Sequence, residues 1–169
     1  MLWKKAAEIH KITPFAFALM LDTDGVLSWE FPKSFHSSFA LHKDLDWDVL
    51  GANRKRRYYD TWTLRIKDII EFDCWEEIML GEKNGGNREK LHKKTSIYHG
   101  VVPKDKGLFP VLNAFGGAAL YRFEKALPCI DKYRGVRPDG IEECDHIHFH
   151  DCIRERGGKI FIDTNMYNH

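Results

Sequence analysis

The first strand-like pattern of hydrophobic positions in the chain ends in two carboxylates. Residues 15–21 form an apolar run of strand length, followed by Asp22-Thr23-Asp24 and a glycine. A buried strand that delivers Asp-x-Asp to its carboxyl end places both carboxylates where open α/β sheets bind ligands. Carboxylates in that position hold a divalent metal, react themselves, or do both. Asp-x-Asp recurs at 44–46 and 46–48, but only the first copy follows an apolar strand.

The remaining pattern predicts alternating helices and strands. A helix over 2–11 stops before Thr13-Pro14, since proline disfavours helix in the preceding residue. Residues 25–45 show no clear period and predict a loop with a short helix. The polar, glycine-rich residues 81–96 predict an exposed, mobile loop. The other predicted elements are a strand at 47–53, helices at 66–80, 124–133 and 142–156, and a strand at 159–163.

A double glycine interrupts the apolar stretch 110–122. Gly116 and Gly117 indicate either a close backbone approach or a turn with positive φ between two strands.

Length and composition indicate one soluble domain over residues 1–169. The chain is 43% hydrophobic with a formal net charge of +1, which gives no overall attraction to nucleic acid or membrane. No apolar run approaches the roughly 20 residues that span a bilayer. The four cysteines form no C-x-x-C pair, so we expect reduced thiols in a cytoplasmic or similarly non-oxidising compartment, with a disulfide as the alternative.

Further candidate groups have simpler explanations. Glu143 and Asp145 stand where the helix 142–156 is predicted to start, and acidic residues there can merely cap the helix and favour its dipole. The alternating histidines at 146, 148 and 150 would face different sides of that helix, which makes a poor zinc site. The basic run Arg54-Lys55-Arg56-Arg57 could meet a diphosphate or an acidic polymer, but solvated loop charges explain it more simply.

Taken jointly, four blocks in order resemble nucleotide-sugar glycosyltransferases of the GT-A fold, in the group of the capsule-associated α-mannosyltransferases and related viral and bacterial enzymes. The blocks are Leu21-Asp22-Thr23-Asp24, Tyr59-Asp60-Thr61-Trp62-Thr63-Leu64-Arg65, Asn113-Ala114-Phe115-Gly116-Gly117-Ala118-Ala119-Leu120-Tyr121-Arg122, and Glu143-Cys144-Asp145-His146 through to Phe161-Ile162-Asp163-Thr164-Asn165-Met166.

The resemblance implies a fold and a reaction. The fold would be a Rossmann-like α/β sandwich whose mainly parallel sheet is flanked by helices, without much of the usual N-terminal nucleotide-binding half. A partner chain would be one way to supply that half. The reaction would move a sugar from a nucleoside-diphosphate donor to a hydroxyl of a glycan or other acceptor, with Mn²⁺ or Mg²⁺ as cofactor.

The resemblance also implies residue roles. Asp24 would bind the metal, and Asp22 would hold the donor ribose or a metal-bound water. Asp145 or Glu143 would contact the acceptor hydroxyl and serve as general base if the enzyme inverts. The remaining implied site residues are Gly116, Gly117, Trp62 and Arg65 for substrate and His169 as a further metal ligand.

The first block permits a second interpretation. Leu19-Met20-Leu21-Asp22-Thr23-Asp24-Gly25-Val26-Leu27 resembles the opening motif of haloacid-dehalogenase-type phosphatases, in which Asp22 would be the nucleophile, Asp24 the acid/base and Mg²⁺ the cofactor. The later acidic pair of that family, Gly-Asp-x-x-x-Asp, is missing from the sequence. A non-catalytic protein that binds a sugar or nucleotide is the third possibility.

Overall fold

A mixed sheet forms the centre of the protein. The computed structural model describes residues 2–138 and 140–168. Its strands pair in the order β1-β4-β2-β5-β3. Their bounds are β1 (Phe17–Leu21), β2 (Val49–Asn53), β3 (Leu108–Pro110), β4 (Ala118–Arg122) and β5 (Ile160–Tyr167).

The strand directions correct one part of the sequence prediction. Among the neighbouring strands of this sheet, β2 and β5 form the one parallel pair, and the pairs β1–β4, β4–β2 and β5–β3 are antiparallel. The mainly parallel sheet was therefore a wrong prediction, because β4 leaves the glycine turn in the direction opposite to both of its neighbours. The broader prediction, an α/β protein with helices flanking a mixed sheet, is confirmed.

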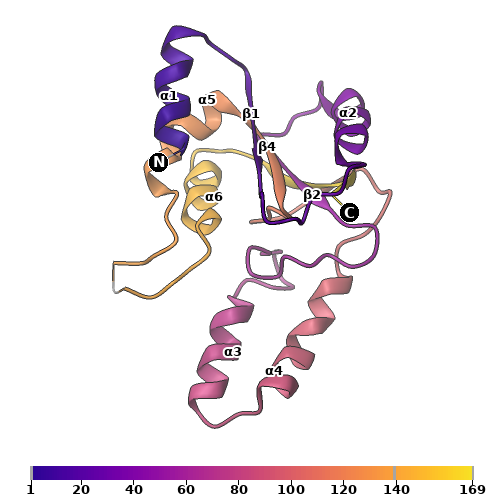
Figure 1. Ribbon diagram of the computed structural model, residues 1–169, viewed down its shortest axis with the longest axis vertical. Helices are drawn as coiled ribbons and strands as arrows, with labels where there is room; N and C mark the ends of the chain where they lie inside the picture. Colours follow the sequence, from indigo (N-terminus) through magenta and orange to yellow (C-terminus); the bar gives the residue numbers. More distant parts are fainter. Residues whose placement is uncertain (1, 139, 169) are drawn as a thin grey trace.

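Helices cover the sheet from both sides. In Figure 1, α1, α5 and α6 gather on one side, α2 lies on the other, and α3 and α4 project away from the sheet. The helical bounds are α1 (Leu2–Ile12), α2 (Phe31–His42), α3 (Cys74–Lys83), α4 (Arg88–Thr95), α5 (Phe123–Ala126) and α6 (His146–Glu155), with 3-10 helices η1 (Ser96–Gly100) and η2 (Leu127–Lys132).

The alternation of side chains along β4 produces two apolar cores. Ala119 and Tyr121 pack in the cluster that contains residues of α1 and α6. Ala118 and Leu120 pack in the cluster that contains Phe31 of α2. Because successive strand residues point to opposite faces, one short strand serves both layers.

The strand before Asp22 lies at the edge of the sheet. β4 is its one neighbour in the strand order. Phe17 packs against the α2 side, but Leu19 and Leu21 are 39% and 42% exposed. The predicted buried strand is therefore an edge strand, and the two carboxylates that follow it open toward solvent.

Two predicted boundaries were wrong because side-chain caps outweighed hydrophobic spacing. The carboxylate of Asp73 accepts hydrogen bonds from the backbone N–H groups of Trp75 and Glu76, so α3 begins after it and not at residue 66. The side chain of Asn87 accepts from Lys90 N–H and starts α4 inside the predicted loop 81–96. That part of the chain is a helical hairpin with a short connection (Figure 1).

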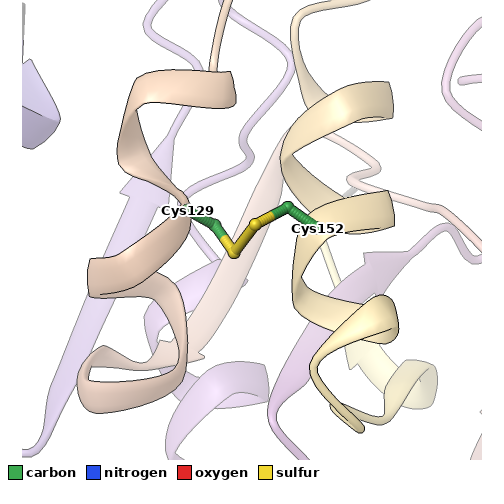
Figure 2. Close-up of a disulfide and its surroundings, with 2 residues drawn as sticks. All are labelled: Cys129 and Cys152. Atoms are coloured by element: carbon green, nitrogen blue, oxygen red, sulfur yellow. A yellow bond between two sulfur atoms is a disulfide. The ribbon is translucent and has the colours of Figure 1, made fainter.

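A disulfide crosslinks η2 to α6. Figure 2 shows Cys129 and Cys152 joined between these helices. The expectation of reduced thiols was wrong for this pair, and it agrees with the structure for the free, buried Cys74 and Cys144. The crosslink closes a loop that contains Glu143 and Asp145, so it constrains the segment on which the predicted base stands.

Candidate functional site

The loop after β1 is tied to the double-glycine turn. The backbone N–H of Asp22 donates to the carbonyl of Gly117 at 2.9 Å. Asp24 is exposed, and its Oδ1 accepts a long, 3.4 Å hydrogen bond from Val26 N–H. The backbone of the Asp-x-Asp loop is thus fixed while the Asp24 side chain stays accessible to a ligand.

The turn itself needs both glycines. Gly116 and Gly117 have φ values of 68° and 82°, in the region that L side chains rarely occupy. A Cβ on Gly116 would lie 2.2 Å from the carbonyl oxygen of Ala52, and one on Gly117 would lie 2.7 Å from the Tyr59 hydroxyl. Both predicted features, positive φ and close approach, are therefore confirmed.

Asp60 joins this turn from a different segment. Its Oδ2 accepts hydrogen bonds from Gly116 N–H at 2.9 Å and from the Thr63 hydroxyl at 2.6 Å. Asp60 lies in the second block of the resemblance, but its role was not predicted. The signal available in the sequence was its position directly after Tyr58-Tyr59, outside any predicted helix.

Asp145 approaches from the start of α6. Its carboxylate makes no capping hydrogen bond to the helix, contrary to the simpler explanation for an acidic residue there. Instead Oδ1 lies 2.8 Å from Nδ1 of His146. Burial alone would raise the pKa of Asp145, but the hydrogen bond and charge of His146, with a hydrogen bond from Tyr133, hold it below its usual value. The side chain of Asp145 is 37% exposed against 5% for His146, so Asp145 is the accessible member of the pair.

The four aspartates Asp22, Asp24, Asp60 and Asp145, here called the carboxylate cluster, influence one another. Burial first, and then the negative charges of Asp24, Asp60 and Asp145, raise the pKa of Asp22 to about 6, against the opposing effect of His146. Three separate segments therefore bring negative charge to one place. Such repulsion is relieved by a bound cation.

The donor atoms of the cluster fit Mn²⁺ or Mg²⁺. Both ions prefer oxygen ligands, and Mg²⁺ is typically held by one or two carboxylates together with substrate phosphates. Asp22 and Asp24 can supply such a partial shell. Among the described residues, one group brings three ligand atoms within 4.8 Å of one another, namely Cys144, Asp145 and His146. Burial raises the pKa of the Cys144 thiol in the metal-free protein, and a thiol is a softer ligand than the oxygen donors that Mg²⁺ and Mn²⁺ prefer.

A hollow of about 1030 Å³ borders the carboxylate cluster on one side. We call it the basic hollow. Its lining consists of Gly25, Leu27, Ser28, Trp29, Glu30, Arg54, Lys55, Arg56, Arg57, Tyr59 and His99. The run of basic residues is thus solvated, as predicted from the sequence, and at the same time forms the wall of a large hollow.

Tyr59 separates the basic hollow from the carboxylate cluster. The guanidinium carbon of Arg54 lies over the Tyr59 ring, 5.0 Å from its centroid. Burial, followed by the charges of Asp60, Asp22 and Asp24, raises its pKa well above the usual value, so the hydroxyl stays protonated. A ligand in the hollow can therefore reach the cluster past an uncharged hydrogen-bond donor.

A second hollow of about 310 Å³ holds the other predicted site residues. We call it the acidic hollow. Its lining consists of Trp62, Arg65, Glu71, Phe72, Asp73, Glu76, Met79, Arg137, Glu142, Glu143 and Ile147. The structure thus divides the predicted residues between the cluster and this hollow.

Two of these residues are held by other side chains. The buried guanidinium of Arg65 donates to Asp73 Oδ2 at 3.0 Å and to the carbonyls of Trp62 and Leu64. Glu143 is also buried, and its Oε1 lies 2.9 Å from Nε2 of His148. Arg65 therefore stabilises the local backbone, and Asp145 is the better candidate for a base than Glu143.

His169 lies outside the described residues, so its predicted place in the metal shell has no structural counterpart. The prediction that the histidines of α6 face different sides was wrong for His146 and His150, which are four residues apart, buried on one face and have ring centroids 5.5 Å apart. His148 lies apart from them and contacts Glu143. In the part of the chain that the structure covers, no helix has the length and apolarity to cross a bilayer.

No family model matches the sequence, and no curated protein matches it. The geometry and charge of the carboxylate cluster and its two neighbouring hollows therefore carry the functional assignment.

Proposed function

We propose that the protein is a metal-dependent glycosyltransferase that moves a sugar from a nucleoside-diphosphate donor to an acceptor hydroxyl. The observation that carries this proposal is the convergence of Asp22, Asp24, Asp60 and Asp145 beside a large basic hollow. A cation site next to guanidinium groups suits a diphosphate, whose charge both can neutralise.

In this proposal Asp22 and Asp24 hold Mn²⁺ or Mg²⁺, and the basic run of the hollow contacts the diphosphate. When bound, the metal supplies a positive charge that stabilises the departing nucleoside diphosphate. Tyr59 donates a hydrogen bond at the border of the two regions. The Gly116–Gly117 turn positions the Asp-x-Asp loop, because the carbonyl of Gly117 accepts the backbone hydrogen bond of Asp22.

Asp145 accepts the proton of the acceptor hydroxyl. The acceptor oxygen then forms a bond to the anomeric carbon, and the bond from that carbon to the diphosphate oxygen breaks with its electrons. Since its pKa is held low, Asp145 is ionised at neutral pH and ready to take the proton. His146 and Tyr133 orient its carboxylate.

Titration calorimetry with UDP, GDP and their sugars, with and without Mn²⁺, tests the proposal. We expect metal-dependent binding that Asp24→Ala abolishes. Asp44→Ala is the matched control, because it removes an exposed aspartate of another Asp-x-Asp triplet, whose ion pair is with Lys43 at 3.9 Å. Transfer of the sugar to an acceptor or to water, lost in Asp145→Asn, completes the test.

Combined with a phosphatase assay, these measurements distinguish two other functions. Mg²⁺-dependent hydrolysis of p-nitrophenyl phosphate that Asp22→Asn abolishes, without nucleotide binding, would overturn the proposal in favour of a phosphatase. Metal-dependent binding of a nucleotide sugar without turnover would instead identify a non-catalytic binding protein.

A further inference from the structure

The acidic hollow adjoins the carboxylate cluster through two shared segments. Asp60 belongs to the cluster and Trp62 lines the hollow, and Asp145 belongs to the cluster and Glu143 lines the hollow. Residues two apart in a chain are separated by at most about 7 Å along the backbone. Asp60 and Asp145 do not line the hollow themselves, so a ligand seated there reaches the carboxylate of Asp145 by extending beyond the lining.

The charge of this hollow is opposite to that of the basic hollow. Five carboxylate side chains line it against the two guanidinium groups of Arg65 and Arg137. Arg65 is already engaged by Asp73 at 3.0 Å, and Arg137 lies 3.5 Å from Glu76. The resulting negative field disfavours an anionic ligand, so a nucleoside diphosphate belongs on the other side of the cluster.

The shape and chemistry of the lining match a sugar ring. Trp62 is 38% exposed and offers an apolar surface. Around it stand side chains such as Glu142 and Glu143, which accept hydrogen bonds from hydroxyl groups. Its volume of about 310 Å³ falls within the range of small-ligand sites, which combine apolar walls with a few placed polar groups.

We infer that the acidic hollow binds an uncharged sugar unit of the acceptor, with its ring against Trp62 and one hydroxyl directed at Asp145. This inference rests on the proposed glycosyltransferase function for the identity of the ligand as an acceptor. The binding of the sugar itself requires neither donor nor metal.

Saturation-transfer NMR on the full chain in EDTA tests this inference. The probes are methyl glycosides of neutral hexoses, with glucuronic acid and glucosamine as anionic and cationic comparisons. We expect saturation of the neutral glycosides and at least a fivefold loss of signal in Trp62→Ala. Trp75→Ala is the matched control, because Trp75 is 37% exposed and lines neither hollow, and it should leave the signal unchanged.

Glu142→Gln provides a second variant at an exposed position of the hollow, so that a folding defect of Trp62→Ala does not decide the outcome. This variant should weaken the saturation-transfer signal of the neutral glycosides at least twofold. Saturation confined to glucosamine, or neutral binding that neither variant changes, would overturn the inference. Neutral sugar binding without nucleotide binding would support this sugar site and contradict the proposed donor reaction. Nucleotide binding without sugar binding would support the donor site and overturn the inference about the acidic hollow.

Discussion

The backbone N–H of Gly116 donates a hydrogen bond to Oδ2 of Asp60 at 2.9 Å. This bond joins the double-glycine turn to the segment between the two hollows, and Thr63 holds the same oxygen at 2.6 Å. Asp60 therefore fixes the turn, and its remaining negative charge helps to raise the pKa of Asp22. One carboxylate thus serves both the shape and the electrostatics of the site.

The turn predicts an unequal response of two glycines to substitution. Gly117 and Gly85 share a φ of 82°, but a Cβ on Gly117 would lie 2.7 Å from both the Tyr59 hydroxyl and Val26 Cγ2, whereas Gly85 has open space. Gly85→Ala should cost about 1 kcal/mol of unfolding free energy from backbone strain alone. Gly117→Ala should cost about 2–4 kcal/mol and weaken metal binding, since the Asp-x-Asp loop must shift.

Urea denaturation of both variants measures these differences. Equal losses of stability at the two positions would show that the Tyr59 hydroxyl and Val26 yield easily, and the close approach would then have no functional consequence.

The crowded carboxylates predict a variant that gains stability and loses function. In the metal-free protein, Asp22→Asn removes a charge whose pKa is raised to about 6. The full shift corresponds to about 3 kcal/mol, which solvent screening at this partly exposed position reduces to about 1 kcal/mol. Thermal unfolding in EDTA at pH 7 should therefore show a higher midpoint for Asp22→Asn than for the wild type.

The pH dependence of this difference follows from the direction of the shift. Between the unfolded pKa of about 3.8 and the folded pKa of about 6, the folded wild type binds a proton that the unfolded chain has released. Wild-type stability relative to Asp22→Asn should thus fall as the pH rises through this window and stay constant above it. Mn²⁺ affinity should rise over the same range. A midpoint difference independent of pH would contradict a raised Asp22 pKa.

The Asp-x-Asp loop and the glycine turn of the candidate site could be predicted from the sequence because each had a local signal. The Asp-x-Asp after an apolar run and the double glycine depend on backbone rules that act over a few residues. Strand direction and the edge position of β1 depend on pairing between distant segments, such as Phe17 with Arg122, which no local pattern specifies. The grouping of Asp60 with Asp22 has the same long-range origin.

The disulfide predicts a dependence of stability on redox conditions. Cys129 and Cys152 are 23 residues apart, and loop closure of this length stabilises a fold by about 3 kcal/mol. Reduction, or the double variant Cys129→Ala/Cys152→Ala, should lower the unfolding free energy by about that amount. It should also weaken activity, because the closed loop contains Asp145. Cys74→Ala is the control, because Cys74 is a free cysteine. This variant should lose as much stability on reduction as the wild type does.

Calorimetric melting with and without dithiothreitol provides the measurement. If reductant leaves the wild-type midpoint unchanged although the thiols are shown to be reduced by alkylation and mass spectrometry, the crosslink does not stabilise the fold.

The contacts of Arg65 predict that its substitution lowers stability and leaves substrate binding unchanged. Its guanidinium donates to Asp73 and to two backbone carbonyls in a buried setting. A lysine ammonium can keep the contact with Asp73, but it cannot reproduce the forked geometry that reaches both carbonyls. Arg65→Lys should therefore cost about 2–3 kcal/mol in urea denaturation, since buried acceptors lose their donors.

Arg57→Lys is the matched control, because Arg57 is exposed on the wall of the basic hollow and should tolerate the change within about 0.5 kcal/mol. Nucleotide titration of the folded variants then separates the two roles of these arginines. Arg65→Lys should bind the nucleotide as the wild type does. Wild-type stability combined with lost substrate binding in Arg65→Lys would return this residue to the substrate-binding role that the sequence predicted, and the backbone contacts would then be incidental to its function.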